Sequence, residues 1–169
     1  INDGDLLKVD TGAFFNGYHG DSCIPICVGK TSDEAINLSK IAQEALMLGI
    51  KQIKPKNKLL DIAGAIEDHV KSNGYSVVED YCGHGIGEIY HEEPQVLHYG
   101  SPGQGTEIVE GMSFTIEPML NLGTKYTKTL SDGWTVETKD GKNSAQWEHT
   151  LAVTTEGCEV LTLRKEESL

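Results

Sequence analysis

An Asn-Gly pair constrains the start of this chain more than any other local feature. Asn16 and Gly17 form a two-residue hairpin turn signal, and strand-forming residues flank them on both sides. The pattern predicts a β-hairpin with strands over Leu6–Phe15 and Tyr18–Val28. It therefore also predicts which side chains of the two strands share a face.

Two aspartates occupy one face of this predicted hairpin. Asp10 faces Cys23, and Asp21 lies two residues from Cys23 on the same strand, so the two acids are diagonal neighbours. Carboxylates on a common half-buried face repel each other, and both stay ionised only beside a cation; otherwise one takes up a proton. We expect a divalent metal, rather than a lysine or arginine side chain, to supply that charge. For Asp10, an ordinary surface carboxylate is the open alternative.

Composition narrows the class of protein. The 169 residues suffice for one domain with a sizeable core. Acidic residues outnumber basic ones by 26 to 14, and the net charge of −12 disfavours nucleic acid as a substrate. The four cysteines form no CxxC pair, so we expect free thiols and a reducing, cytoplasmic setting. We find no run of about 18 apolar residues and no signal peptide, and we expect no membrane partner.

Two helices and several strands are predicted after the hairpin. A Thr31-x-x-Glu34 capping box starts a helix that runs to Ile53, and Pro55 ends it. A second helix covers Leu59 to Asn73, with Gly74 after it. Strands are predicted over Tyr75–Val78, Ser113–Leu122, Trp134–Thr138, Gln146–Thr154 and Glu159–Leu163, followed by a frayed tail over Arg164–Leu169. The fold class is α/β (α+β), with an antiparallel sheet and two helices on one face.

Three further side chains are candidate metal ligands. His84 has glycines on both sides, which give backbone freedom and open access; a turn histidine bonded to backbone is the alternative. Glu117 has apolar neighbours and precedes Pro118, so it is buried or at a strand end. Glu148 lies within a strand pattern, and His149 beside it is either solvent-facing or a support for a ligand.

Together the five candidates comprise four carboxylates and one imidazole. This set is oxygen-rich and carries too much negative charge for a single divalent ion. Two ions about 3.5–4 Å apart, with carboxylates bridging them, fit better. Such a centre suits hydrolysis, with a bridging water as the nucleophile.

Long blocks of the sequence resemble type I methionine aminopeptidases. The signature block is YCGHGIG from Tyr81 to Gly87, followed after three residues by HEEPQVLHY from His91 to Tyr99. GMSFTIEP before Met119 and SAQWEHT before Leu151 are similar to the same family, as is the spacing of the two hairpin aspartates. The resemblance covers essentially all 169 residues.

The resemblance implies a pita-bread fold with a curved antiparallel sheet, and removal of the initiator methionine from nascent polypeptides. Residues 1–169 would form a single metallopeptidase catalytic domain in which the N-terminal half of the fold is truncated. We therefore expect less than full activity from this chain alone. Since the chain begins with Ile1, both a natural start and a missing upstream segment stay open.

The resemblance also implies roles by position. Asp10 would chelate one metal ion, His84 and Glu117 the other, and Asp21 and Glu148 would bridge them. Glu117 would handle the proton of the attacking water, and His91 would hydrogen-bond the substrate near the scissile carbonyl. Tyr90 and Trp134 would line the methionine pocket, with core packing as the alternative for each. The ions would be Co, Mn, Fe, Zn or Ni, and the enzyme would be a monomer that acts close to the ribosome.

Two other functions are considered. A prolidase-like relative would cleave before proline, but the unbroken HEEPQVLHY block favours methionine. An inactive binding module on the same fold would be expected to lack metal ligands, whereas all five are present.

Overall fold

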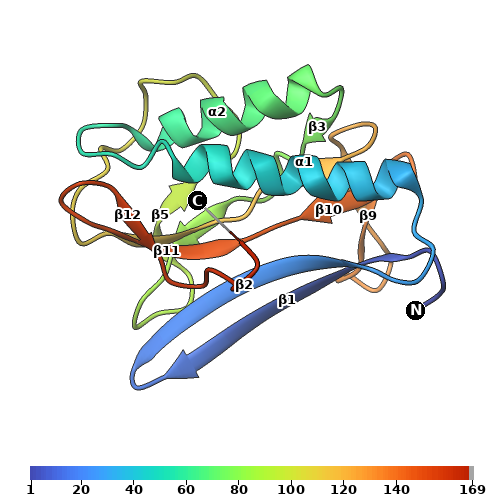
Figure 1. Ribbon diagram of the computed structural model, residues 1–169, viewed down its shortest axis with the longest axis horizontal. Helices are drawn as coiled ribbons and strands as arrows, with labels where there is room; N and C mark the ends of the chain where they lie inside the picture. The colour runs from blue at the N-terminus through green and yellow to red at the C-terminus, as the bar shows by residue number, and fades with distance from the viewer. Residues whose placement is uncertain (168–169) are drawn as a thin grey trace.

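The computed structural model describes residues 1–167, in which two helices cover one side of a set of antiparallel sheets (Figure 1). The five-stranded sheet has the order β12-β11-β6-β4-β5, and the three-stranded sheet has the order β10-β7-β3. The elements are β1 Leu6–Phe15, β2 Tyr18–Cys27, α1 Asp33–Ile50, α2 Leu59–Ser72, β3 Ser76–Val77, β4 Gly83–Gly85, β5 Glu92–Val96, β6 Ser113–Ile116, β7 Met119–Asn121, β8 Thr127–Thr129, β9 Val136–Thr138, β10 Ser144–Gln146, β11 His149–Val153 and β12 Cys158–Val160. The predicted fold class is confirmed.

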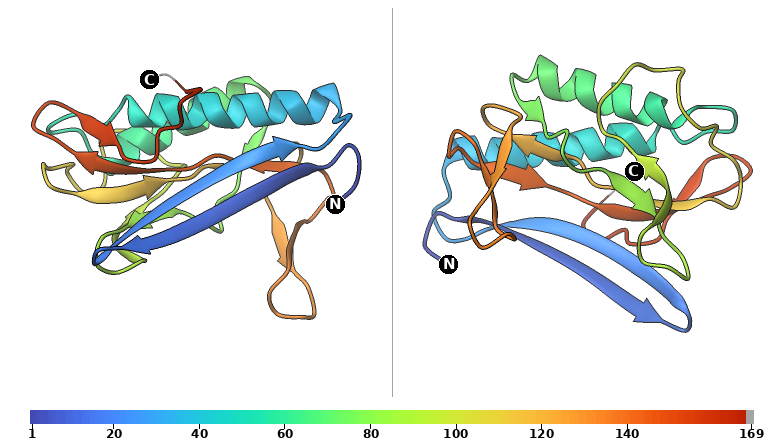
Figure 2. Two further views of the ribbon diagram at one scale, coloured as in Figure 1. Left: turned by 60° about the horizontal axis from the view of Figure 1, so that its bottom comes forward. Right: turned by 180° about the vertical axis from the view of Figure 1, so that it is seen from behind.

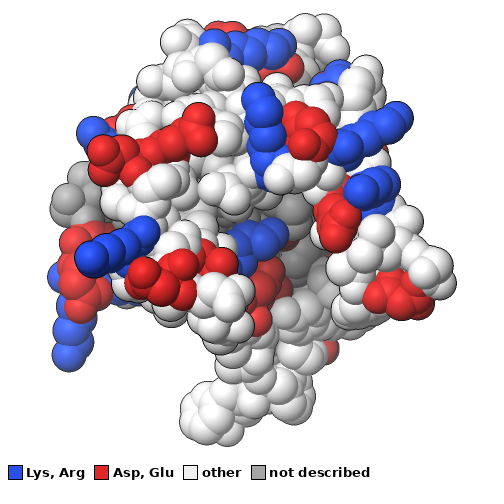
Figure 3. All heavy atoms as spheres, turned by 90° about the vertical axis from the view of Figure 1, so that its right-hand side faces the viewer, with Lys and Arg blue, Asp and Glu red and all other residues white. Residues whose placement is uncertain are grey.

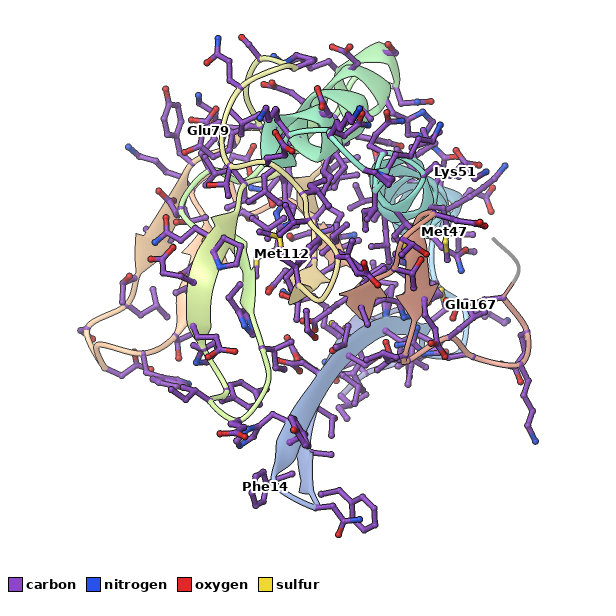
Figure 4. The ribbon with its side chains drawn as sticks, turned by 90° about the vertical axis from the view of Figure 1, so that its left-hand side faces the viewer. Phe14, Met47, Lys51, Glu79, Met112 and Glu167 are labelled. Atoms are coloured by element: carbon purple, nitrogen blue, oxygen red, sulfur yellow. The ribbon has the colours of Figure 1, made fainter. Side chains whose placement is uncertain are left out.

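The hairpin has the predicted turn and register. Asn16 and Gly17 have positive φ angles of 50° and 90°, as the tight primed turns of hairpins require. Asp10 pairs with Cys23, as predicted. The hairpin projects from the body, and Phe14 near its tip points away from the rest of the chain (Figure 4). Figure 2 shows that the shorter β8–β9 hairpin projects on the same side, opposite the helices.

Helix α1 differs from its prediction at both ends. Its N-cap is Ser32, whose hydroxyl accepts the N–H of Ala35 at 3.3 Å, while the Thr31 hydroxyl donates to the carbonyl of Asp5. The predicted capping box at Thr31 was therefore wrong by one residue. The helix ends at Ile50 instead of Ile53. Neither described helix has the length and apolar character needed to cross a membrane.

Two strands that were predicted as continuous are each broken in two. The first break, at Glu117 and Pro118, separates β6 from β7, and the second, at Trp147 and Glu148, separates β10 from β11. Proline has no N–H to donate, which ends the first ladder. The breaks lie opposite each other, because β6 pairs with β11 in one sheet and β7 with β10 in the other. Both glutamates therefore lie where one sheet gives way to the next.

The core lies between the helices and the two larger sheets. Its largest fully buried apolar side chains include Leu38, Leu46, Ile62, Ile66, Phe114, Ile116, Leu120 and Leu151. Each contributes on the order of 1.5–3 kcal/mol to folding. This layer holds rigid the strands from which three of the candidate ligands emerge.

The predicted frayed tail is wrong for residues 164–167. Arg164 donates to the hairpin backbone, and the side chain of Glu167 is 4% exposed. These contacts come from elements far away in sequence, so local composition gave no sign of them. The rest of that prediction, residues 168–169, lies outside the described residues.

We predict that Ser32→Ala lowers the free energy of unfolding by about 1 kcal/mol, because the helix loses its capping acceptor. Ser32→Asp, which keeps an acceptor, should retain most of the stability. Urea unfolding followed by circular dichroism measures both variants. Equal midpoints for Ser32→Ala and the parent chain would contradict the assignment of the cap.

Candidate metal centre

The five predicted ligands converge from the hairpin and the sheets. Asp10, Asp21, His84 and Glu117 line a cavity of about 870 Å³. Glu148 lies beside it, since ligand atoms of Asp21, His84 and Glu148 all lie within 4.8 Å of one another. Figure 3 shows one face of the molecule hollowed near its middle, with acidic and basic side chains around the hollow.

His84 lies between the acids of the hairpin and those of the sheets. Its Nε2 is 3.8 Å from Asp21 Oδ2 and 3.6 Å from Glu117 Oε1. Its Nδ1 is 3.0 Å from the carbonyl of Gly85. The backbone N–H of His84 donates to the hydroxyl of Thr115. The backbone-bonded alternative thus holds for one ring nitrogen, and the other is free to bind a metal.

The glycines beside His84 allow close approach between strands; the predicted backbone freedom was not the reason. Neither Gly83 nor Gly85 has a positive φ angle. A Cβ at Gly83 would overlap the carbonyl of Thr115, and a Cβ at Gly85 would overlap the carbonyl of Glu93. The motif therefore packs β4 tightly against its neighbours and brings His84 to the acids.

Hydrogen bonds fix the carboxylate of Glu117 from both sides. The hydroxyl of Thr115 donates to Oε1 at 2.8 Å, and the amide of Gln146 donates to Oε2 at 3.2 Å. The backbone N–H of Glu117 donates to Nε2 of His98 at 3.1 Å. His98 is buried, and burial lowers its pKa to about 3, so the ring is neutral and can accept.

A lysine also contributes to the site, contrary to the expectation that only a metal would compensate the acids. Nζ of Lys8 donates to Oε1 of Gln146 at 3.2 Å. Because an ammonium group has donors only, it fixes the orientation of the amide, and the NH₂ group faces Glu117. A single lysine still leaves four neighbouring carboxylates undercompensated.

The electrostatics of the cluster reflect burial without partners. Glu148 is 1% exposed, and neither carboxylate oxygen has a hydrogen-bond partner among the described residues. Burial, and then the charges of Glu117 and Asp21, raise its pKa to about 10. Burial likewise raises the pKa of Glu117 to about 8. Carboxylate oxygens without hydrogen-bond partners, beside an imidazole nitrogen, are ligands that divalent ions bind. The residues present therefore fit a metal centre.

Asp10 differs from the other acids in exposure. Asp10 is exposed, whereas Asp21 is 5% exposed and Cys23 on the same face is fully buried. The face that was expected to be half-buried is thus buried at Asp21 and open at Asp10. Even so, partial desolvation and the nearby charge of Asp21 raise the pKa of Asp10. Asp10 lines the cavity together with three of the other candidate ligands, and its role as a ligand stays a prediction.

The three predicted substrate-contacting residues line the same cavity. The His91 ring centroid is 4.3 Å from that of His84 and 4.5 Å from that of Tyr90. Tyr90 lies over Gly12 of the hairpin, where a Cβ would overlap its hydroxyl. Trp134 precedes β9 and is 87% exposed, so core packing is wrong for this residue.

Sequence reasoning missed the side chains that orient Glu117. Thr115 and Gln146 each lie two residues before a predicted ligand, Glu117 and Glu148 respectively. Polar side chains at that spacing in an apolar strand were a usable signal. Lys8 lies two residues before Asp10 and was overlooked in the same way.

Comparisons with known proteins identify the family to which these residues and this fold belong. Metallopeptidase family M24 matches residues 1–155. Methionine aminopeptidase of Escherichia coli is 48% identical over 169 residues, which is 100% of this chain and 64% of that protein. Methionine aminopeptidase 1 of Bacillus subtilis is 46% identical over 162 residues, 96% of this chain and 65% of that protein. The chain thus spans slightly less than two-thirds of the length of these relatives.

Solved structures agree with the sequence comparisons. The crystal structure of methionine aminopeptidase from Rickettsia prowazekii matches with a TM-score of 0.94 and 41% identity, over 96% of this chain and 66% of that one. The prolidase from Pyrococcus furiosus matches with a TM-score of 0.77 and 26% identity, over 98% of this chain and 43% of that one. The resemblance seen in the signature blocks is confirmed.

The raised pKa values predict a pH dependence for the metal-free chain. Folded Glu117 and Glu148 hold protons that the unfolded chain loses above the ordinary value of 4.5. The resulting stability is complete below that pH and is lost as the pH rises through about 8 and about 10. We expect the free energy of unfolding to fall between about pH 5 and pH 9, by up to about 1.4 kcal/mol per pH unit for each of the two groups.

Urea titrations in the presence of a chelator measure this change. Glu148→Gln, which is neutral at every pH, should reduce the dependence to the part that Glu117 contributes. Stability that is constant or rises with pH in the parent chain would contradict the electrostatics described above.

Proposed function

Because this chain belongs to metallopeptidase family M24, we propose that it forms the catalytic unit of a metalloaminopeptidase that removes N-terminal methionine from nascent polypeptides. The observation that carries the proposal is the convergence of Asp21, His84, Glu117 and Glu148 beside an open cavity that Asp10 also lines. Divalent metal use follows from the family, and the number of ions and the reaction steps are our proposal.

Two divalent ions would be held by the five ligands. Asp21 and Glu148 would lie between the ions, Asp10 would bind one, and His84 with Glu117 the other. When bound, such ions supply a water molecule activated near neutral pH and stabilise negative charge on the attacked carbonyl. Oxygen-rich sites accept Co, Mn, Fe, Zn or Ni, and the cell's supply selects among them.

Glu117 is suited to move a proton in this site. Burial brings its pKa near neutrality in the absence of metal, and its two hydrogen-bond donors hold the carboxylate in one orientation. A carboxylate positioned in this way can accept a proton from the attacking water and then, as the carboxylic acid, donate it to the leaving amine.

His91 and the cavity aromatics would handle the substrate. His91 stands on the cavity wall beside His84, where an N–H can donate to the oxygen of the scissile carbonyl. Tyr90 and Trp134 offer ring surfaces to a methionine side chain, and thioether sulfur packs favourably against aromatic rings.

The cellular compartment is proposed from the state of the cysteines. All four cysteines are free thiols, which fits a reducing compartment such as the cytoplasm. The substrates would be the N-termini of new polypeptides. A monomeric state and action close to the ribosome stay predictions.

A peptide panel tests the proposal. The chain is loaded with Co²⁺ or Mn²⁺ and given Met-Ala-Ser and an X-Pro peptide of equal length. We expect release of methionine and little cleavage before proline. Preference for the X-Pro peptide would support a prolidase-like enzyme, and failure to bind either ion in excess would support the binding module.

The role of His91 is tested by substitution. We predict that His91→Ala retains metal affinity but lowers kcat by about 10²–10³, the effect of removing one donor to a developing oxyanion. Titration calorimetry with Co²⁺ and steady-state kinetics give the two readouts. Kinetics equal to those of the parent chain would remove His91 from the mechanism.

A further inference from the structure

Arg164 joins the C-terminal segment to the middle of strand β2 of the hairpin. Its Nη2 donates to the hydroxyl of Ser22 at 2.5 Å and to the carbonyl of Cys23 at 3.1 Å. These two residues directly follow Asp21. The guanidinium also lies over the Trp147 ring, 5.6 Å from its centroid, and Trp147 directly precedes Glu148. Arg164 therefore contacts the chain next to both proposed bridging ligands.

The contacted residues form the joint between the hairpin and β11. The N–H of Glu148 donates to the carbonyl of Cys23 at 3.1 Å, and the hydroxyl of Ser22 donates to the carbonyl of Glu148 at 3.3 Å. The N–H of Ser22 donates to Oδ1 of Asp21 at 2.9 Å, which orients that carboxylate. Arg164 thus adds two donors at the place where the positions of Asp21 and Glu148 are set.

Glu167 completes the contact on the opposite side. Its carboxylate accepts from Nη1 of Arg164 at 3.2 Å, and Oε2 lies 3.2 Å from Nε2 of His149, which directly follows Glu148. Oε1 accepts from the amide of Gln43 on α1 at 3.3 Å. Figure 4 shows Glu167 between α1, marked by Met47 and Lys51, and the hairpin. His149 is fully buried here, so of its two alternatives the solvent-facing one was wrong.

The hairpin is also held to the sheets through Thr150, whose hydroxyl accepts the N–H of Asp21 at 2.9 Å and donates to the carbonyl of Asp21 at 2.8 Å. It projects from the body, and β1 has only β2 as a strand partner within residues 1–167 (Figure 1). A small rotation of β2 at this joint would carry Asp21 away from His84 and Glu148. A planar guanidinium, with donors in a fixed fork, resists such a rotation better than a flexible ammonium.

We propose that Arg164 and Glu167 form a clasp that positions Asp21 and Glu148 for metal binding. The inference rests on the proposed function, since it assigns the clasp to the same metal centre. Both residues lie beyond residues 1–155, which the family model matches, but within the 169 residues that align with methionine aminopeptidase of Escherichia coli. They are positioning residues, because they act through Ser22, Cys23 and His149, which they contact, and not as ligands themselves.

The test compares Arg164→Met, Glu167→Gln and the control Lys165→Met. Methionine keeps an apolar stem over Trp147 but removes every donor, and exposed Lys165 is the neighbouring basic residue. We expect Arg164→Met to weaken Co²⁺ binding by about 10–100-fold, as loss of a group that orients a ligand does. The visible absorption spectrum of the Co²⁺-loaded chain should change, Arg164→Lys should restore it only in part, and Lys165→Met should match the parent.

Glu167→Gln keeps shape and solubility and covers the case in which Arg164→Met does not fold. It should weaken Co²⁺ binding in the same direction by a smaller factor. Parental Co²⁺ affinity and spectrum in the folded variants, with only urea stability lowered, would reduce the clasp to a structural strap and overturn the inference. If the parent chain itself binds no Co²⁺, the proposed function fails, and the clasp fails with it.

Discussion

Repulsion among carboxylates that share one cavity is the constraint on which the rest of this structure depends. Four acids lie around His84, and the most buried of them, Glu148, has no hydrogen-bond partner among the described residues for either oxygen. Such a cluster is costly unless protons or cations neutralise it. The fold nevertheless assembles this cluster through two breaks in its strands. The breaks at Glu117 and Glu148 place both glutamates between two sheets.

Hydrogen bonds from neighbouring side chains fix the positions and orientations of the acidic groups. Thr115 and Gln146 hold the Glu117 carboxylate, and Lys8 fixes which way the Gln146 amide faces. Neutral His98 accepts the backbone N–H of Glu117. The clasp does the corresponding work for the hairpin, whose acids stay close to the sheets only if the joint between β2 and β11 stays in place. These supports come from both ends of the chain and from strands between.

How much the sequence reveals depends on the range of the interactions involved. The hairpin register was predictable because the turn and the alternation of side chains are local. The candidate ligands were located from that register and from the blocks that resemble the family, and their role as ligands stays a prediction. The broken strands, the Ser32 cap and the anchored tail were not. Alternation alone shows no break at Glu148, and Arg164 finds Ser22 and Cys23 only across the folded chain. Lys8 was overlooked although its spacing from Asp10 was visible.

The central claim is that these five side chains hold two divalent ions. Crystals of the Co²⁺-loaded chain, measured by anomalous diffraction at the cobalt absorption edge, test it most directly. The account predicts two cobalt peaks, both bounded by Asp21 and Glu148, with Asp10 on one side and His84 with Glu117 on the other. Cobalt bound elsewhere on the chain, with this cavity empty and its carboxylates unmoved, would contradict it.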